Sequence, residues 1–179
     1  MSFRSFSLQP FSEAGPVSNI KITGKISRVS NRLAIHYELL GHLNDVALPM
    51  PADMPARKNA LWEETCFELF IAVGASSRYL EFNLSPAGHW NVFRFAGYRK
   101  EMQEDTAYGL LPFRVRRKSG VLSLSLEIAL EGILHKDQAL EVGISAVIKY
   151  RDGMTSYWSL SHPDLQADFH RRDGFLIEL

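Results

Sequence analysis

Three polar residues stand out because each lies on the polar side of a segment whose other side is strongly apolar: Glu68, Glu81 and Asn83. Apolar residues fall at every second position from 67 to 73 and from 80 to 84, which is the period of a β-strand. Only a short loop separates the two segments, so they are expected to pair, and paired side chains have Cβ atoms about 5 Å apart. The spacing therefore predicts that two carboxyl groups and an amide gather on one sheet face.

This cluster has three interpretations. It is a solvated outer face, a face that binds a polar ligand, or the acid pair of a glycoside hydrolase, whose carboxyl groups lie about 5 to 9 Å apart. Nothing in the sequence marks one carboxyl as a buried acid and the other as a base. We therefore expect a protein without catalytic activity and keep hydrolysis by Glu68 and Glu81 as the enzymatic alternative.

The three tryptophans are expected to have different roles. Trp62 lies where a proline-rich loop meets the strand that carries Glu68. An aromatic ring in that position suits stacking on the apolar face of a sugar, and covering the edge of the sheet is the alternative. Trp90 and Trp158 lie inside apolar strands, so they are predicted to be core residues.

Other catalytic and metal-binding motifs are not recognisable. The six histidines form no HExxH motif, and none makes a close pair with the single cysteine, Cys66. The patterns GxSxG, GxGxxG and GxxxxGK(S/T) are also absent from the sequence. The loop from His162 to His170 holds residue types that zinc uses, but stabilisation of a surface turn is its expected role. We expect no bound metal, and we expect Cys66 to be half-buried in a strand.

Composition and charge describe an ordinary globular domain. The 179 residues include 20 lysines and arginines and 20 aspartates and glutamates, with 46% hydrophobic and 22% charged residues. A chain of zero net charge lacks the excess of cations that nucleic acid or an anionic membrane attracts. One cysteine excludes a disulfide within the chain. The first residues lack the apolar core of a signal peptide, and no run reaches the ~20 apolar residues of a membrane span, so the expected location is the cytoplasm.

Alternation of apolar and polar residues recurs along the chain far more often than helical spacing does. This pattern, with its frequent turns, predicts one all-β domain over residues 1–179, an antiparallel two-sheet β-sandwich with under about 15% helix. Because apolar residues lie on one side of each predicted strand and polar residues on the other, each sheet is expected to have one solvent-exposed (wet) face. A loop or short helix is expected at 100–107 and one helical turn at 129–134. Ten strands are expected, at 20–26, 33–39, 67–73, 80–84, 90–95, 113–117, 121–128, 142–150, 155–160 and 175–179.

The segment from Trp62 to Ile71 resembles a signature of family 9 carbohydrate-binding modules, which belong to the DOMON-like group of β-sandwiches. The family pattern is a tryptophan, five intervening residues, a glutamate and then an apolar strand. The next stretch, YLEFNLSPAGHW, resembles the hairpin that follows in the family. The end of the chain resembles its closing segment, in which an aromatic residue precedes a phenylalanine by six positions, here Phe169 and Phe175.

In sugar-binding members of that family, two tryptophans enclose a terminal sugar and polar groups on the strands bind its hydroxyls. By position, the resemblance assigns stacking to Trp62 and Phe169, and hydrogen bonding to Glu68, Glu81 and Asn83. Phe169 stands where the family has its second tryptophan, and Glu81 stands where it has an arginine. The resemblance thus selects the same polar face as the alternation.

Together, these observations predict a non-catalytic domain for a small polar ligand, with a saccharide favoured. A haem-binding redox or sensor domain is the alternative, because other DOMON-like domains hold haem through a methionine and a histidine. No such pair of a methionine and a histidine is recognisable in this sequence, so we expect no bound haem. A protein-interaction module is the third hypothesis. The five site residues should converge around one cleft, with a cation such as Arg114 or a shared proton beside Glu81.

Overall fold

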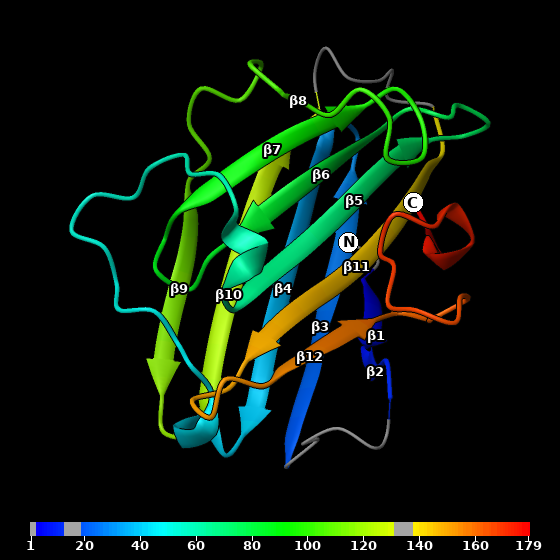
Figure 1. Ribbon diagram of the computed structural model, residues 1–179. Coiled ribbons are helices and arrows are strands. Elements are labelled where there is room, and N and C mark those ends of the chain that lie inside the picture. The colour runs from blue at the N-terminus through cyan, green and yellow to red at the C-terminus, as the bar shows by residue number, and fades with distance from the viewer. Residues whose placement is uncertain (1–2, 13–18, 131–137) are drawn as a thin grey trace.

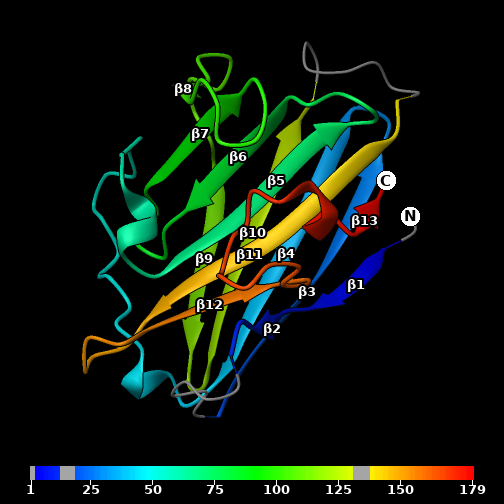
Figure 2. The same ribbon diagram turned by 45° about the vertical axis from the view of Figure 1, so that its right-hand side comes forward.

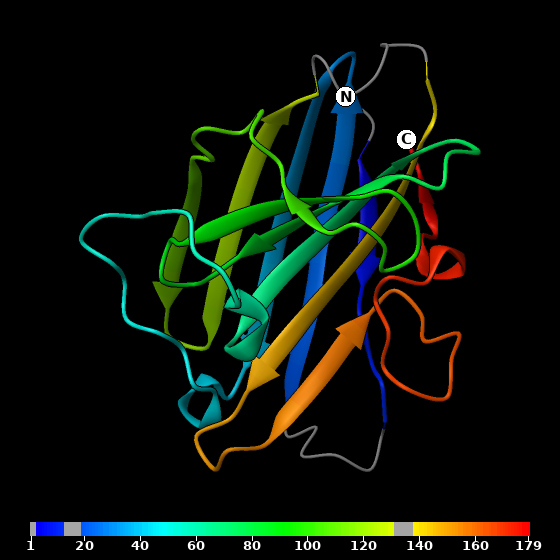
Figure 3. The same ribbon diagram turned by 45° about the horizontal axis from the view of Figure 1, so that its top comes forward.

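The computed structural model describes residues 3–12, 19–130 and 138–179, and it is a β-sandwich of two antiparallel sheets (Figure 1). Strands account for 52% of the chain and helix for 5%, which confirms the predicted fold class. Strands of the second sheet run diagonally across those of the first (Figure 3). Among the described residues, no helix is long and apolar enough to cross a membrane.

The first sheet has five strands in the order β1-β3-β4-β10-β9. They are β1 (Arg4–Ser7), β3 (Ile20–Val29), β4 (Arg32–Gly41), β9 (Phe113–Lys118) and β10 (Val121–Ala129). Burial alternates along β4 and β10, so one face of this sheet packs inward and the other meets solvent. The arginines of the edge strand β9 are exposed.

The second sheet follows the order β2-β12-β11-β5-β6-β7-β8, with β13 paired to β11. Its strands are β2 (Gln9–Pro10), β5 (Cys66–Val73), β6 (Tyr79–Leu84), β7 (Trp90–Phe95), β8 (Gln103–Glu104), β11 (Leu140–Lys149), β12 (Thr155–Ser159) and β13 (Ile177–Glu178). The described helical segments are three short 3-10 helices, η1 (Leu43–Asp45), η2 (Leu61–Glu63) and η3 (Arg172–Gly174).

The main core lies between the sheets, where the alternating apolar residues of both meet. Trp90 and Trp158 belong to it, as predicted. Tyr37 is fully buried in it and donates a hydrogen bond to the backbone carbonyl of Glu68 at 3.0 Å, which ties the first sheet to β5. Cys66 is completely buried, so the prediction of a half-buried cysteine is wrong.

The outer face of the second sheet is covered, contrary to the expectation of a wet face on each sheet. Every residue of β6, and all of β5 except its last residue, is buried. A second apolar cluster lies on this face, and the segment after β12 packs on it (Figures 1 and 2). The cluster consists of Phe70, Ala72, Tyr79, Phe93, Phe95 and Phe175, with Phe169 packed against it.

Two residues, Arg172 and Phe175, hold the carboxyl-terminal segment on the sheet. The guanidinium of Arg172 donates to the Glu141 carboxylate at 2.5 Å and to the carbonyl of Gly74 at 2.6 Å. The ring of Phe175 lies directly on Gly143 of β11, where an added Cβ would sit 2.7 Å from ring atom Cδ1. Glycine at 143 therefore lets the aromatic ring approach the sheet backbone.

Replacing Gly143 with alanine should lower the free energy of unfolding by roughly 1 to 3 kcal/mol, because Phe175 must move to admit the new methyl group. Urea unfolding would measure the change. Gly109→Ala is the matched control, since nothing lies within 4 Å of its added Cβ. Equal effects of the two substitutions would contradict this account of Gly143.

The strands predicted at 80–84, 90–95, 113–117, 121–128, 142–150 and 155–160 are present. Each consecutive two of them pair as an antiparallel hairpin, as the short connections between them favour. Of the loop and the short helix expected at 100–107, the structure shows a loop that includes the two-residue strand β8. The closing strand is shorter than predicted, because only Ile177–Glu178 pairs with β11. The helical turn predicted at 129–134 falls largely outside the described residues.

Candidate ligand-binding site

The floor of the candidate site is formed by β5 and β6, which pair antiparallel as predicted. Glu68 lies opposite Asn83, and Phe70 lies opposite Glu81, so the two glutamates are diagonal neighbours. The strand period then directs Glu68, Glu81 and Asn83 to the same, outer face of the sheet. This is the face that the carboxyl-terminal segment covers.

A cavity of about 390 Å³ opens on this face. It contains four of the five residues that the sequence and the resemblance selected: Trp62, Glu68, Glu81 and Phe169. Trp62 and Phe169 therefore lie on the same side of the second sheet, around one cavity. The full lining is Trp62, Glu68, Glu81, Phe95, Arg99, Met102, Val147, Tyr157, Ala167, Phe169 and His170.

Asn83 is the fifth selected residue, and it lies beneath the cavity. Its side chain is completely buried, and Nδ2 donates a hydrogen bond to Oε1 of Glu81 at 2.8 Å. Its Oδ1 accepts a weak hydrogen bond from the Cys66 thiol at 3.7 Å. Asn83 thus holds the Glu81 carboxyl in position.

Two aromatic residues mark the mouth of the cavity. Trp62, on η2, is 37% exposed and packs edge-on against Phe93, with ring centroids 5.8 Å apart. Phe169 comes from the segment after β12 and packs against Tyr157 at 6.2 Å. An exposed ring above a polar floor can stack on the apolar face of a ligand while the floor bonds to its polar groups.

Burial dominates the chemistry of the Glu68 carboxyl. Its residue is only 3% exposed, and Oε2 accepts one hydrogen bond from Ser145 Oγ at 3.1 Å. Loss of solvent raises the pKa of Glu68 to about 8, and the nearby charge of Glu81 adds to the rise. Glu68 therefore carries a proton through much of the neutral range.

Glu81 is similarly buried, with 4% exposure. Loss of solvent raises its pKa to about 7, although the hydrogen bond from Asn83 opposes the rise. Its second oxygen, Oε2, has no hydrogen-bond partner, and Nε2 of His170 lies 3.9 Å away. The floor therefore presents an acid pair, one oxygen of which lacks a donor.

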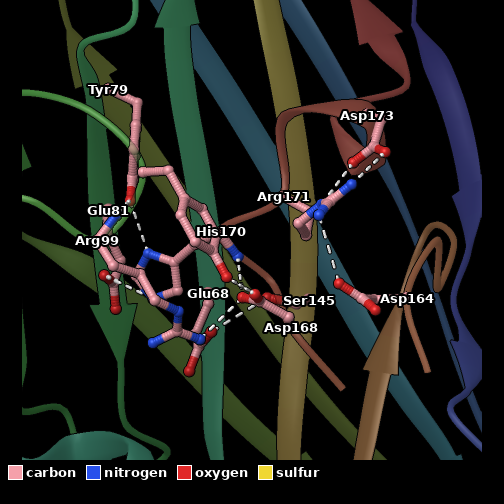
Figure 4. A network of polar contacts seen from close by, with 11 residues as sticks. Glu68, Tyr79, Glu81, Arg99, Ser145, Asp164, Asp168, His170, Arg171 and Asp173 are labelled. Carbon is pink, nitrogen blue, oxygen red and sulfur yellow. Dashed lines mark hydrogen bonds and ion pairs between the residues drawn. The ribbon is translucent and has the colours of Figure 1, made fainter. Parts of the chain in front are cut away.

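Arg99 is the cation beside this acid pair, and it comes from the loop after β7 (Figure 4). The prediction of Arg114 is wrong, because Arg114 lies on β9 of the other sheet. Arg99 Nη2 bonds to the Asp168 carboxylate at 2.8 Å, and Tyr98 donates a short hydrogen bond to the same carboxylate. These bonds connect the loop after β7 to the carboxyl-terminal segment across the cavity.

His170 is a neutral member of the site. Burial, together with the charge of Arg99, lowers its pKa to about 4. Its Nδ1 lies 2.8 Å from the Tyr79 hydroxyl, which accepts a hydrogen bond from the backbone N–H of Arg99 at 3.2 Å. The Tyr79 hydroxyl can donate its proton to Nδ1, and in that tautomer the proton of the neutral imidazole resides on Nε2. Nε2 is the atom that faces Glu81.

Sequence reasoning missed Arg99 and His170. His170 was noted only in a loop with zinc-type residues, and the expected role as a surface turn is wrong for it, since its side chain is 14% exposed and packs on Phe70 and Phe95. Within the described part of the chain, no group of three histidine, cysteine, aspartate or glutamate residues is arranged to hold a metal ion.

Two solved structures share this fold. A candidate carbohydrate-binding protein from Bacteroides uniformis superposes with a TM-score of 0.71 at 12% identity, over 96% of this chain and 84% of that chain. A family 9 carbohydrate-binding module from Caldicellulosiruptor kristjanssonii, in complex with cellotriose, gives a TM-score of 0.51 at 11% identity, over 87% and 71% of the two chains. No protein-family model and no curated protein sequence matches the chain. At these identities the likeness concerns the fold alone.

Proposed function

We propose that this protein is a non-catalytic domain that binds a saccharide in the cavity above β5 and β6. The observation that carries the proposal is the pairing of an exposed tryptophan at the mouth with buried hydrogen-bonding groups on the floor. A sugar ring offers both an apolar face and hydroxyl groups, so it matches both surfaces at once. Membership of the DOMON-like group remains a prediction.

The fold neighbours support this proposal, since one is described as a candidate carbohydrate-binding protein and another holds cellotriose. The arrangement of the acids favours binding over hydrolysis. Glycosidases place their two carboxyl groups on either side of the scissile bond. Here Glu68 and Glu81 are neighbours on one sheet floor.

Removing the Trp62 ring should weaken saccharide binding by about 1 to 3 kcal/mol, because one central aromatic residue commonly dominates such a contact. Isothermal titration calorimetry with a panel of mono- and oligosaccharides would identify a ligand and then compare Trp62→Ala with the native protein. Phe3→Ala is the control, since Phe3 is an exposed aromatic residue outside the cavity lining. Unchanged affinity in Trp62→Ala would remove Trp62 from the site, and the absence of any saccharide ligand would refute the proposal.

We expect no stoichiometric binding of haem, although Met102 and His170 both line the cavity. His170 Nδ1 is hydrogen-bonded to Tyr79, so iron coordination there would break that bond, and Nε2 faces the buried Glu81 carboxyl at 3.9 Å, which leaves little room for an iron. Haem titration followed by absorption spectroscopy should show no saturating Soret band. A band that disappears in both Met102→Ala and His170→Ala would favour the haem hypothesis instead.

A further inference from the structure

The cavity has an excess of acid over base. Glu68 and Glu81 form its floor, and Arg99 is the one cation among its described lining residues. The Arg99 charge is already matched by its 2.8 Å ion pair with Asp168, and His170 is neutral. The two floor carboxyls therefore share the Arg99 charge with Asp168, and no lysine or arginine in the described part of the chain forms an ion pair with either of them.

One oxygen of this pair also lacks a hydrogen-bond donor. Oε1 of Glu81 is bonded by Asn83, whereas Oε2 is buried without a partner. Nε2 of His170, at 3.9 Å, is too distant for a hydrogen bond. A buried acceptor left without a donor is unfavourable, and native proteins contain few. Glu81 lines the cavity, so a small rotation of its carboxyl would bring this buried oxygen to a donor on a ligand.

The remaining walls suit a cation. The rings of Trp62, Phe95, Tyr157 and Phe169 all line the cavity. Aromatic faces carry partial negative charge and attract ammonium groups, and they also stack on the apolar faces of sugars. A neutral sugar can stack on the rings and donate hydroxyl hydrogen bonds to the floor, but it brings no positive charge to the acid pair. A metal ion satisfies the acids but not the rings, and no three-residue ligand group for one occurs among the described residues.

We infer that the saccharide bound here carries a free amine, with its ammonium group placed against Oε2 of Glu81 between the two floor carboxyls. This inference rests on the proposed function and narrows it to amino sugars. An ammonium offers three hydrogen-bond donors and one positive charge, so one group fills the vacant acceptor and balances the charge. An N-acetylated sugar lacks that charge and is expected to bind less well.

Binding of an ammonium should release protons. Near pH 7 the Glu68 and Glu81 pair retains protons because burial raises both pKa values. The ammonium favours the ionised carboxylates, so protons leave as it binds. The other titratable groups around the pair are Arg99, Asp168, Tyr79, His170, Tyr37 and Cys66. Burial raises the pKa values of Tyr37 and Cys66 well above their ordinary values, so both stay protonated. Arg99 and Asp168 are already paired as ions, and the pKa values of Tyr79, about 12, and His170, about 4, lie far from neutral.

The test is calorimetric titration at pH 7 with glucosamine, galactosamine and mannosamine, each beside its neutral parent hexose and its N-acetyl derivative. At least one amine should bind at least tenfold more tightly than both of its neutral counterparts. Repeating that titration in buffers of different ionisation enthalpy should reveal proton release. If neutral sugars bind equally well, the inference fails while saccharide binding stands. If no sugar binds, both fail.

The substitution Glu81→Gln tests whether the ammonium group binds at the Glu81 carboxyl. It keeps the size and the hydrogen bond from Asn83 but removes the charge, so the preference for the amine over its neutral parent hexose should fall at least tenfold. Glu63→Gln is the control, because Glu63 is an exposed acid next to Trp62. Circular dichroism would verify the fold of both variants. A full amine preference in Glu81→Gln, or no proton release by the native protein, would overturn the inference.

Discussion

Replacing Trp90 with alanine is expected to lower the free energy of unfolding by about 3 to 5 kcal/mol, as large-to-small changes of buried aromatic residues do. Trp90 is 2% exposed, lies in the core between the sheets, and carries the guanidinium of Arg57 4.4 Å above its ring. Its backbone also accepts and donates hydrogen bonds with the loop at 56–58. Truncation therefore leaves a cavity and removes the ring on which the Arg57 guanidinium packs, while the backbone hydrogen bonds can remain.

Chemical denaturation with urea would measure this loss, and Trp62→Ala provides the internal comparison. Trp62 is 37% exposed, so its removal should change stability far less than the removal of Trp90. Comparing the two substitutions thus distinguishes an effect on folding, at Trp90, from an effect on binding, at Trp62. Similar free energies of unfolding for Trp90→Ala and the native protein would show that Trp90 is not a core residue.

Stability should fall by on the order of 3 kcal/mol as the pH rises from 6.5 to 9, because the pKa values of Glu68, about 8, and Glu81, about 7, lie above the ordinary value of 4.5. In this range the unfolded chain has already lost both protons, whereas the folded protein must lose them inside the sheet. The folded state therefore weakens until both carboxyls are ionised. His170 offsets this fall by only about 0.4 kcal/mol above pH 6.5, because its folded-state pKa of about 4 leaves the folded imidazole already neutral while the unfolded one loses its remaining proton.

Urea unfolding at pH 6.5, 7.5 and 9 would measure this dependence. The double variant Glu68→Gln with Glu81→Gln cannot ionise at either position, so its stability should vary little over the same range. Glu63→Gln should retain the native dependence, since this carboxyl is exposed. A native protein whose stability is flat from pH 6.5 to 9 would mean that the two carboxyls are not buried as described.

Alternation in the sequence was sufficient to predict the central strands, the hairpins and the gathering of Glu68, Glu81 and Asn83. The period of a strand directs residues two apart to one face, and the short loops determine which strands pair. The placement of Trp62 and Phe169 came from the resemblance. That both line one cavity with the glutamates is now seen in the structure.

The parts of the site that the sequence did not predict come from loops, whose residues follow no period comparable to that of a strand. Arg99 lies in a tight turn with a positive φ of 51°, and its direction follows from that turn and from Asp168, which is distant in sequence. The covering of the outer face was also missed. Phe70 and Tyr79 on the supposedly polar side of β5 and β6 were the available signal, since such rings seldom remain in solvent.

The division of the cavity into a strand floor and a loop rim has a consequence for how its specificity can evolve. Glu68, Glu81 and Asn83 belong to strands that are buried on both sides, so most substitutions there also disturb the core. Trp62 and Phe169 belong to irregular segments whose changes affect few core contacts. Relatives in which the loop rim has changed would therefore bind ligands of different shape while retaining the acid floor. The shape of the ligand should accordingly change faster in evolution than the polar groups that the floor recognises.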